Sequence, residues 1–257
     1  MFPTRGFTIA TCTATTAATM GLLFSPGLGG VSSAQTGGNP DPQRLAAQAQ
    51  AGLRKATSVR LDYVDRSLTA TSNKRLPTAM NIALDRRGNC AGTLTLGGHG
   101  GSVEIIKRGT EVWLKPDQTF WKAELPGERG VAASREFEDR YIHGSTSNAL
   151  LSGIASTCDL EALQQAAMVK APASLHVGLA TTLDGTRVVP LTFEVNGLTS
   201  TLYVTADRLH HLYRAAQKGP DTDLSLTFTD YNKPVPVRTP LASESVDISQ
   251  VPNLPAS

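Results

Sequence analysis

The residues best suited to catalysis lie in a glycine-rich loop. In residues 97–101, His99 is surrounded by four glycines, and a His-Gly-Gly run also occurs in the oxyanion loops of esterases. An esterase of that kind also needs a nucleophilic serine in a Gly-x-Ser-x-Gly turn, and the sequence contains no such pentad. We therefore interpret the loop as a flexible hairpin turn and not as a catalytic site.

The other titratable side chains show no catalytic or metal-binding spacing. The histidines have neither a His-x-x-x-His repeat nor a cysteine at metal-ligand distance; they are His99, His143, His176, His210 and His211. His210 and His211 are expected to point to opposite faces of one strand. The acidic run at residues 136–139 is typical of a solvated helix face. We therefore predict that the protein is not an enzyme and that it binds neither a cofactor nor a metal.

Composition excludes several further classes. The chain has 257 residues, of which 40% are hydrophobic and 18% are charged, and its formal net charge is +2. That length is ample for a hydrophobic core, and three cysteines are too few for a disulfide-stapled miniprotein. A nearly balanced charge gives no basic surface for nucleic acid.

Residues 1–34 follow the pattern of a signal peptide. Arg5 is their only charge, an apolar or small stretch follows it, and small residues precede Gln35. We predict export to the cell envelope or the extracellular space, with cleavage after Ala34. The alternatives are a retained membrane helix, for which the threonine-rich middle is poorly hydrophobic, and lipidation at Cys12. The apolar stretch before Cys12 is too short to favour lipidation.

Cleavage would leave two cysteines, Cys90 and Cys158. An even pair in an oxidising compartment is more often bridged than free. We therefore predict a structural disulfide between them, and two buried free thiols are the alternative.

We predict that the mature chain consists of a linker at 35–42, one domain at 43–250 and a tail at 251–257. Apolar periodicity predicts helices over 42–57, 134–141, 145–154 and 160–169. Alternation and turn signals predict strands over 59–64, 79–84, 90–96, 102–107, 111–115 and 119–122, and later over 175–183, 187–195, 200–206, 209–215 and 224–231. The end of the chain, from residue 234, is proline-rich and is expected to be extended. The strand spacing is typical of an antiparallel sheet.

Several segments resemble exported actinobacterial lipoproteins of the LolA-like and LppX/LprG-like group. They are residues 53–60, 84–93, 112–117 with 120–121, 157–160 and 226–235. The resemblance covers nearly the whole mature chain. Such proteins usually carry a cysteine for lipidation directly after the apolar segment, where this chain has Gln35, so a permanent lipid anchor is not expected.

The resemblance implies an α+β fold: a single large antiparallel β-sheet, curved as an unclosed half-barrel, with helices covering its concave face. It also implies an apolar cavity for acyl chains. We expect that cavity to be lined by Met80, Ile82, Leu94, Val103, Ile105, Val112, Leu114, Leu150, Leu151, Ile154, Leu163 and Met168. The alternative is that these residues pack a solid core.

The function that follows is an exported, non-catalytic binding protein that carries or senses lipids or other apolar molecules in the cell envelope. We expect a monomer with a lipid or other apolar ligand, peripheral membrane contact and no nucleic-acid partner. The alternative is an envelope module with a solid core that binds a protein partner through a sheet edge or the proline-rich end of the chain.

Overall fold

One sheet runs through the whole described part of the protein. The computed structural model describes residues 41–167, 172 and 174–250. The predicted signal segment with Cys12 and Ala34, most of the predicted linker, Met168 and residues 251–257 lie outside the described residues. The strands of the first half are β1 (Ser58–Asp65), β2 (Pro77–Asp85), β3 (Cys90–Leu96), β4 (Ser102–Arg108), β5 (Glu111–Pro116) and β6 (Tyr141–Ser145).

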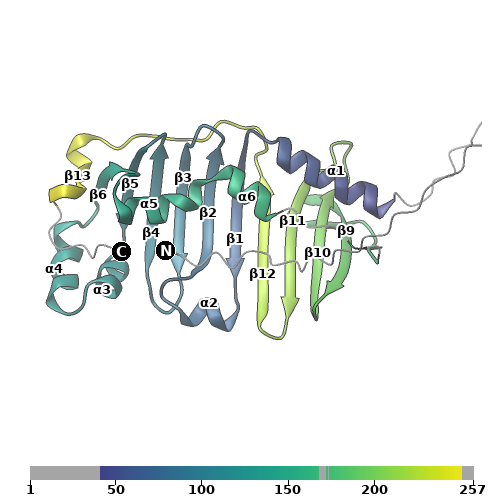
Figure 1. The fold of residues 1–257 in the computed structure, drawn as a ribbon, viewed down its shortest axis with the longest axis horizontal. Coiled ribbons are helices and arrows are strands. Elements are labelled where there is room, and N and C mark those ends of the chain that lie inside the picture. Colours follow the sequence, from purple (N-terminus) through teal and green to yellow (C-terminus); the bar gives the residue numbers. More distant parts are fainter. Residues whose placement is uncertain (1–40, 168–171, 173, 251–257) are drawn as a thin grey trace, which may run out of the picture.

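The second half supplies the remaining strands. They are β7 (His176–Val177), β8 (Thr181–Leu183), β9 (Thr186–Val195), β10 (Leu198–Thr205), β11 (Leu212–Gly219), β12 (Thr222–Thr229) and β13 (Ser245–Asp247). Within the described residues these 13 strands form a single sheet in the order β13-β6-β5-β4-β3-β2-β1-β12-β11-β10-β9-β7, with β8 also on β9 (Figure 1). All pairs are antiparallel except β13 with β6, so the predicted large, open antiparallel sheet is confirmed.

Alternation places apolar side chains on one face, which we call the inner face. Side chains of a strand point alternately to the two faces. The register therefore aligns one residue from each neighbouring strand in a continuous row: Phe228, Leu61, Ile82, Gly92, Ile105, Leu114 and Ile142. The six apolar side chains of this row are almost completely buried, and they form the centre of the hydrophobic core.

Helices cover the inner face (Figure 1). They are α1 (Pro42–Lys55), α5 (Ala149–Ala155) and α6 (Leu160–Ala166), with the short 3-10 helix η1 (Ser156–Cys158) between the last two. Asp41 caps α1 by accepting a hydrogen bond from the backbone N–H of Gln43, and a proline occupies the first helical position. The buried stripe of α1, including Leu45 and Leu53, packs onto the second half of the sheet.

The remaining short elements lie at the ends and edges of the sheet. They are α2 (Leu68–Ser72), α3 (Gln118–Glu124), α4 (Glu128–Glu136), η2 (Ala242–Glu244) and η3 (Ile248–Gln250). After β12 the chain crosses the upper ends of the strands without regular structure before it forms η2 and β13 (Figure 1). The extended segment expected from residue 234 is confirmed only up to residue 241, because residues 242–250 form η2, β13 and η3.

The strand predicted at 119–122 is wrong, because this segment is part of helix α3. Asp117 accepts a hydrogen bond from the backbone N–H of Phe120 and so caps the helix.

The helix predicted over 134–141 was placed too late in the chain: α4 ends at Glu136, and residues 141–145 form β6. Pairing with β5 overrides the weak helical periodicity there.

The predicted strand over 209–215 begins too early. His210 and His211 precede β11, which starts at Leu212. Asp207 accepts hydrogen bonds from the backbone N–H groups of Leu209 and His210, which closes a turn before the strand begins.

The glycine-rich loop is a hairpin turn between β3 and β4, as predicted, but it is packed against its neighbours. Gly98 donates a backbone hydrogen bond to Thr71 in α2. At Gly101, whose φ is 83°, a side chain would collide with the backbone of Phe120 in α3. The glycines therefore allow three segments to meet closely, while His99 itself is exposed.

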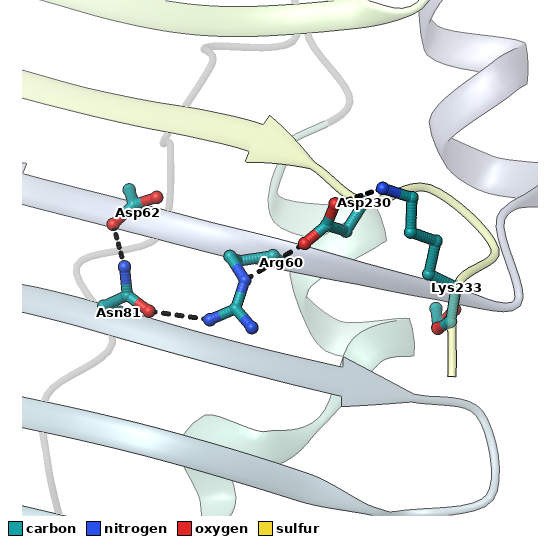
Figure 2. A network of polar contacts seen from close by, with 6 residues as sticks. Arg60, Asp62, Asn81, Asp230 and Lys233 are labelled. Carbon is teal, nitrogen blue, oxygen red and sulfur yellow. Dashed lines mark hydrogen bonds and ion pairs between the residues drawn. The ribbon is translucent and has the colours of Figure 1, made fainter. Parts of the chain in front are cut away.

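A polar network on the outer face connects the end of β12 to β1 and β2 (Figure 2). The guanidinium of Arg60 contacts Asp230 at 3.2 Å and donates to Asn81 at 2.9 Å, and Asn81 in turn donates to Asp62. Lys233 contacts Asp230 at 2.8 Å. Hydrogen bonds from Lys233 and then Arg60 lower the pKa of Asp230 below its ordinary value.

We predict that Asp230→Asn removes a small, pH-dependent part of the stability. A lowered pKa means that ionised Asp230 stabilises the fold above the ordinary aspartate pKa of about 3.9, and that this contribution disappears as the pH falls through the lower folded-state pKa. Because the pairs are exposed, we expect a loss of less than about 1 kcal/mol at neutral pH. Urea unfolding from pH 7 downwards measures it, with Asp221→Asn as control. An undiminished difference at the lowest pH would contradict the prediction.

Candidate functional site

Most residues predicted to line a cavity are buried in the hydrophobic core. Those with 4% exposure or less are Ile82, Leu94, Val103, Ile105, Val112, Leu114, Leu151 and Ile154. Met80 and Leu163 are partly buried and pack against the same core, and Leu150 is half-buried on α5. The structure thus brings the described members of the predicted set together between the sheet and its helices.

Part of the inner face keeps some exposure. Leu226, Tyr63 and Met80 lie side by side on β12, β1 and β2, and all three are partly buried hydrophobic residues packed against the core. We call these three residues the inner stripe. Burial and the nearby Asp65 carboxylate raise the pKa of Tyr63, which is therefore uncharged at neutral pH. The inner stripe is therefore a part of the inner face that is not fully buried.

The disulfide predicted between Cys90 and Cys158 is present. Cys90 begins β3, and Cys158 ends η1 directly before α6. Both residues are buried, and their Cα atoms are 5.6 Å apart. The bridge therefore ties the helices that cover the inner face to the sheet beneath them.

A pocket lies beside this disulfide, at the ends of β2, β3 and β4 and under α5 and α6. We call it the rim pocket. Its volume is about 790 Å³, within the range of roughly 300–1,000 Å³ that is typical of ligand pockets. It is lined by Arg54, Asp85, Arg86, Gly88, Lys107, Thr146, Ser152, Ala155, Ser156, Cys158, Asp159, Leu160, Glu161, Gln164 and Gln165. Of the cavity and disulfide residues predicted from the sequence, the rim pocket contains only Cys158, although other lining residues belong to the motif segments 53–60, 84–93 and 157–160.

Lys107 is a partly buried charged group of this pocket. In the register it stands between Cys90 and Val112, which are both fully buried on the inner face. Its Nζ donates to the backbone carbonyl of Gly88 at 2.9 Å. Burial lowers the pKa of Lys107, and the carboxylates of Asp159 and Asp85 oppose that shift.

The side of the pocket next to α1 is held by two polar side chains. Arg86 donates to the backbone carbonyls of Ala56 and Arg54, at 3.0 and 2.5 Å. The buried side chain of Gln164, on α6, donates to the carbonyls of Leu53 and Ala56, at 2.8 and 3.0 Å. These bonds satisfy carbonyls at the C-terminus of α1, so that α1, α6 and the β2–β3 turn meet at one point.

A second pocket, of about 370 Å³, lies between the outer face and helices α3 and α4. Its wall includes Glu104, which pairs with Lys115 at 3.1 Å and accepts a hydrogen bond from Tyr141 at 2.6 Å. Burial, followed by the bond to Glu104, raises the pKa of Tyr141. The polar groups of this second pocket largely form hydrogen bonds and ion pairs with one another. They therefore stabilise the fold and do not indicate a ligand.

Sequence reasoning missed the rim-pocket residues, although one signal pointed to them. Val103, Ile105 and Lys107 alternate along β4, so a lysine continues an otherwise apolar inward-facing row. A charge at such a position is expensive unless the site is polar or solvated. Arg54 and Gln164 gave no comparable signal, because only the tertiary structure brings α1 and α6 together.

The architecture defines a class of fold. An open, mostly antiparallel sheet whose inner face is covered by short helices is an unclosed half-barrel. No helix among the described residues is long and apolar enough to cross a membrane.

The chain is similar to several solved structures. LprF from Mycobacterium bovis aligns over 79% of this chain and 99% of its own length, with a TM-score of 0.53 and 13% identity. The lipoprotein LppX from Mycobacterium tuberculosis aligns over 78% and 100%, with a TM-score of 0.48 and 17% identity. A LolA superfamily protein from Nitrosomonas europaea aligns over 77% and 94%, with a TM-score of 0.23 and 11% identity.

The chain therefore shares the fold of LprF, as the resemblance of its sequence motifs implied. No protein-family model matches the sequence, and no curated protein sequence matches it either.

We predict that replacing both bridge cysteines, in Cys90→Ser with Cys158→Ser, lowers the free energy of unfolding. The bridged residues are 68 positions apart, and the chain-entropy relation gives a loss of about 4 kcal/mol for a loop of that length. Urea unfolding of the oxidised wild type and the double variant measures the difference. The wild type in reductant is the control, and it should unfold like the variant. Equal midpoints for the variant and the oxidised wild type would refute the prediction.

Proposed function

We propose that this protein is an exported, non-catalytic binding protein that carries or senses lipids or other apolar molecules in the cell envelope. The observation that carries the proposal is the half-barrel with a helix-covered apolar face. In this arrangement, apolar side chains of the sheet lie under short helices that are not part of the sheet itself. An acyl chain placed between these layers is dehydrated on both sides.

The inner stripe is the proposed starting surface for such a ligand. Tyr63, Met80 and Leu226 are apolar, adjacent and only partly covered. Each methylene group that leaves water contributes about 0.8 kcal/mol, so even a partly covered chain of ten or more carbons would bind measurably.

Deeper binding requires movement of the covering helices. Ile105, Leu114 and Leu151 have 1% exposure or less, so a ligand reaches them only when α5 and α6 shift away from the sheet. These helices have seven residues each, too few to be stable alone, and their position depends on packing. The disulfide holds the junction between the two helices at Cys158, so each helix would shift about that point.

The expected location and state belong to the same proposal. Cleavage of the predicted signal segment would place the mature protein outside the cytoplasm, where it would act as a monomer in peripheral contact with a membrane. The alternative, a protein-binding module with a solid core, draws on the close packing of the predicted cavity residues.

Lipid extraction tests the proposal directly. The mature chain is purified without detergent from an exporting host, and native mass spectrometry is followed by solvent extraction and lipid analysis. We expect bound amphiphiles in near-stoichiometric amount. A ligand-free wild type that also fails to take up a fluorescent fatty acid would overturn the proposal and favour the solid-core alternative.

We predict that Met80→Trp reduces the bound lipid, because the larger side chain occupies the inner stripe. Displacing two or three methylene groups would weaken binding about tenfold or more. The matched control is Thr95→Trp, at an exposed outer-face position on the neighbouring strand. Titration with the fluorescent fatty acid measures both variants. Equal weakening in both would show that the inner stripe is not the binding surface.

A further inference from the structure

We propose that the rim pocket binds an oxyanion, a phosphate or a carboxylate, at the polar end of an amphiphile. The apolar part of the same molecule would lie on the inner face, so this inference rests on the proposed function. The inference assigns a ligand class to the rim pocket. A purely apolar ligand would make no hydrogen bonds with the polar side chains that line this pocket.

The first argument is the supply of hydrogen-bond donors. Arg54 lines the pocket from the last turn of α1, and its side chain has no hydrogen-bond or ion-pair partner among the described residues. The ammonium of Lys107 makes a hydrogen bond to the carbonyl of Gly88 and has further N–H donors. Arg86 adds a third positive charge at the same wall.

The second argument is that two of the three carboxylates of the pocket are already engaged in hydrogen bonds with the protein backbone. Asp85 accepts from the backbone N–H groups of Arg87 and Asn89, and also from the Asn89 side chain. Asp159 caps α6 by accepting from the backbone N–H of Ala162. The third carboxylate, Glu161, is exposed on the surface of α6. The three positive and three negative formal charges of the pocket lining are balanced. The groups nearest the inner face that still have free hydrogen-bonding capacity are donors.

The third argument is continuity with the apolar core. Ala155, Cys158 and Leu160 line the pocket and also belong to the hydrophobic core cluster. Lys107 itself follows Val103 and Ile105 along the inward-facing row of β4. A head group bound to Lys107 would therefore have its chain directed along the inner face of the sheet.

Matched amphiphiles test the assignment. The delipidated mature protein is titrated with dodecyl phosphate and with dodecyl maltoside, which share one chain but differ in the head group. We expect dodecyl phosphate to bind about tenfold tighter than dodecyl maltoside, because its head group would accept charge-assisted hydrogen bonds. Arg54→Gln and Lys107→Met should each remove most of that preference and leave the maltoside affinity unchanged.

Arg44→Gln is the control variant. It removes the same charge from the same helix, at an exposed position that does not line the pocket, and it should keep the preference. Circular dichroism confirms that each variant is folded. If Lys107→Met does not fold, Arg54→Gln decides the matter alone, because its side chain is exposed.

The outcomes separate this inference from the proposed function. If neither amphiphile binds, the proposed function fails together with the inference. If both bind equally, or if dodecyltrimethylammonium is preferred, only the oxyanion assignment is overturned. Inorganic phosphate that binds as tightly as dodecyl phosphate would identify a site for free phosphate and would also overturn it.

Discussion

The pairing of β1 on both of its edges is the constraint on which the rest of the structure depends. β1 aligns Leu61 with Ile82 of β2 on one side and with Phe228 of β12 on the other. Without this double pairing, the early strands and the late strands would form two separate sheets, each with an open edge. A shift of one residue on either side would turn the apolar side chains of β1 away from the core. The polar network around Arg60 and Asp230 reinforces the same junction on the outer face.

The wide sheet creates an apolar face that its own strands cannot cover. The chain covers it with α1 on the second half and with α5 and α6 on the first, and the Cys90–Cys158 bridge attaches the latter pair to β3. The three helices and the β2–β3 turn meet beside the rim pocket, where Arg86 and Gln164 satisfy the carbonyls at the end of α1. The polar pocket and the covered apolar face are therefore consequences of one packing arrangement. This arrangement is the basis on which an amphiphilic ligand is proposed.

Much of the sheet was predictable, because alternation is a local property of the chain. The strand predicted at 90–96 is exact, and its neighbours differ from the observed ends by one or two residues. The failures occur where a local signal was ambiguous. Residues 119–122 contain aromatic residues typical of a strand, but the Asp117 cap makes them helical. Residues 141–145 have no strong pattern and become a strand because the edge of β5 is available.

The sequence by itself determined the alternating strands, the capped helices, the cysteine pair and the motifs that indicated a LolA-like half-barrel. These features depend on side-chain period, on capping residues and on composition, all of which act over a few positions. Only the tertiary structure decided that β1 joins β12, that α1 shares the covering of the inner face, and that Arg54, Lys107 and Gln164 surround one pocket. Residues more than a hundred positions apart meet there. No local pattern encodes such a meeting, because it follows from how the whole sheet and its helices pack.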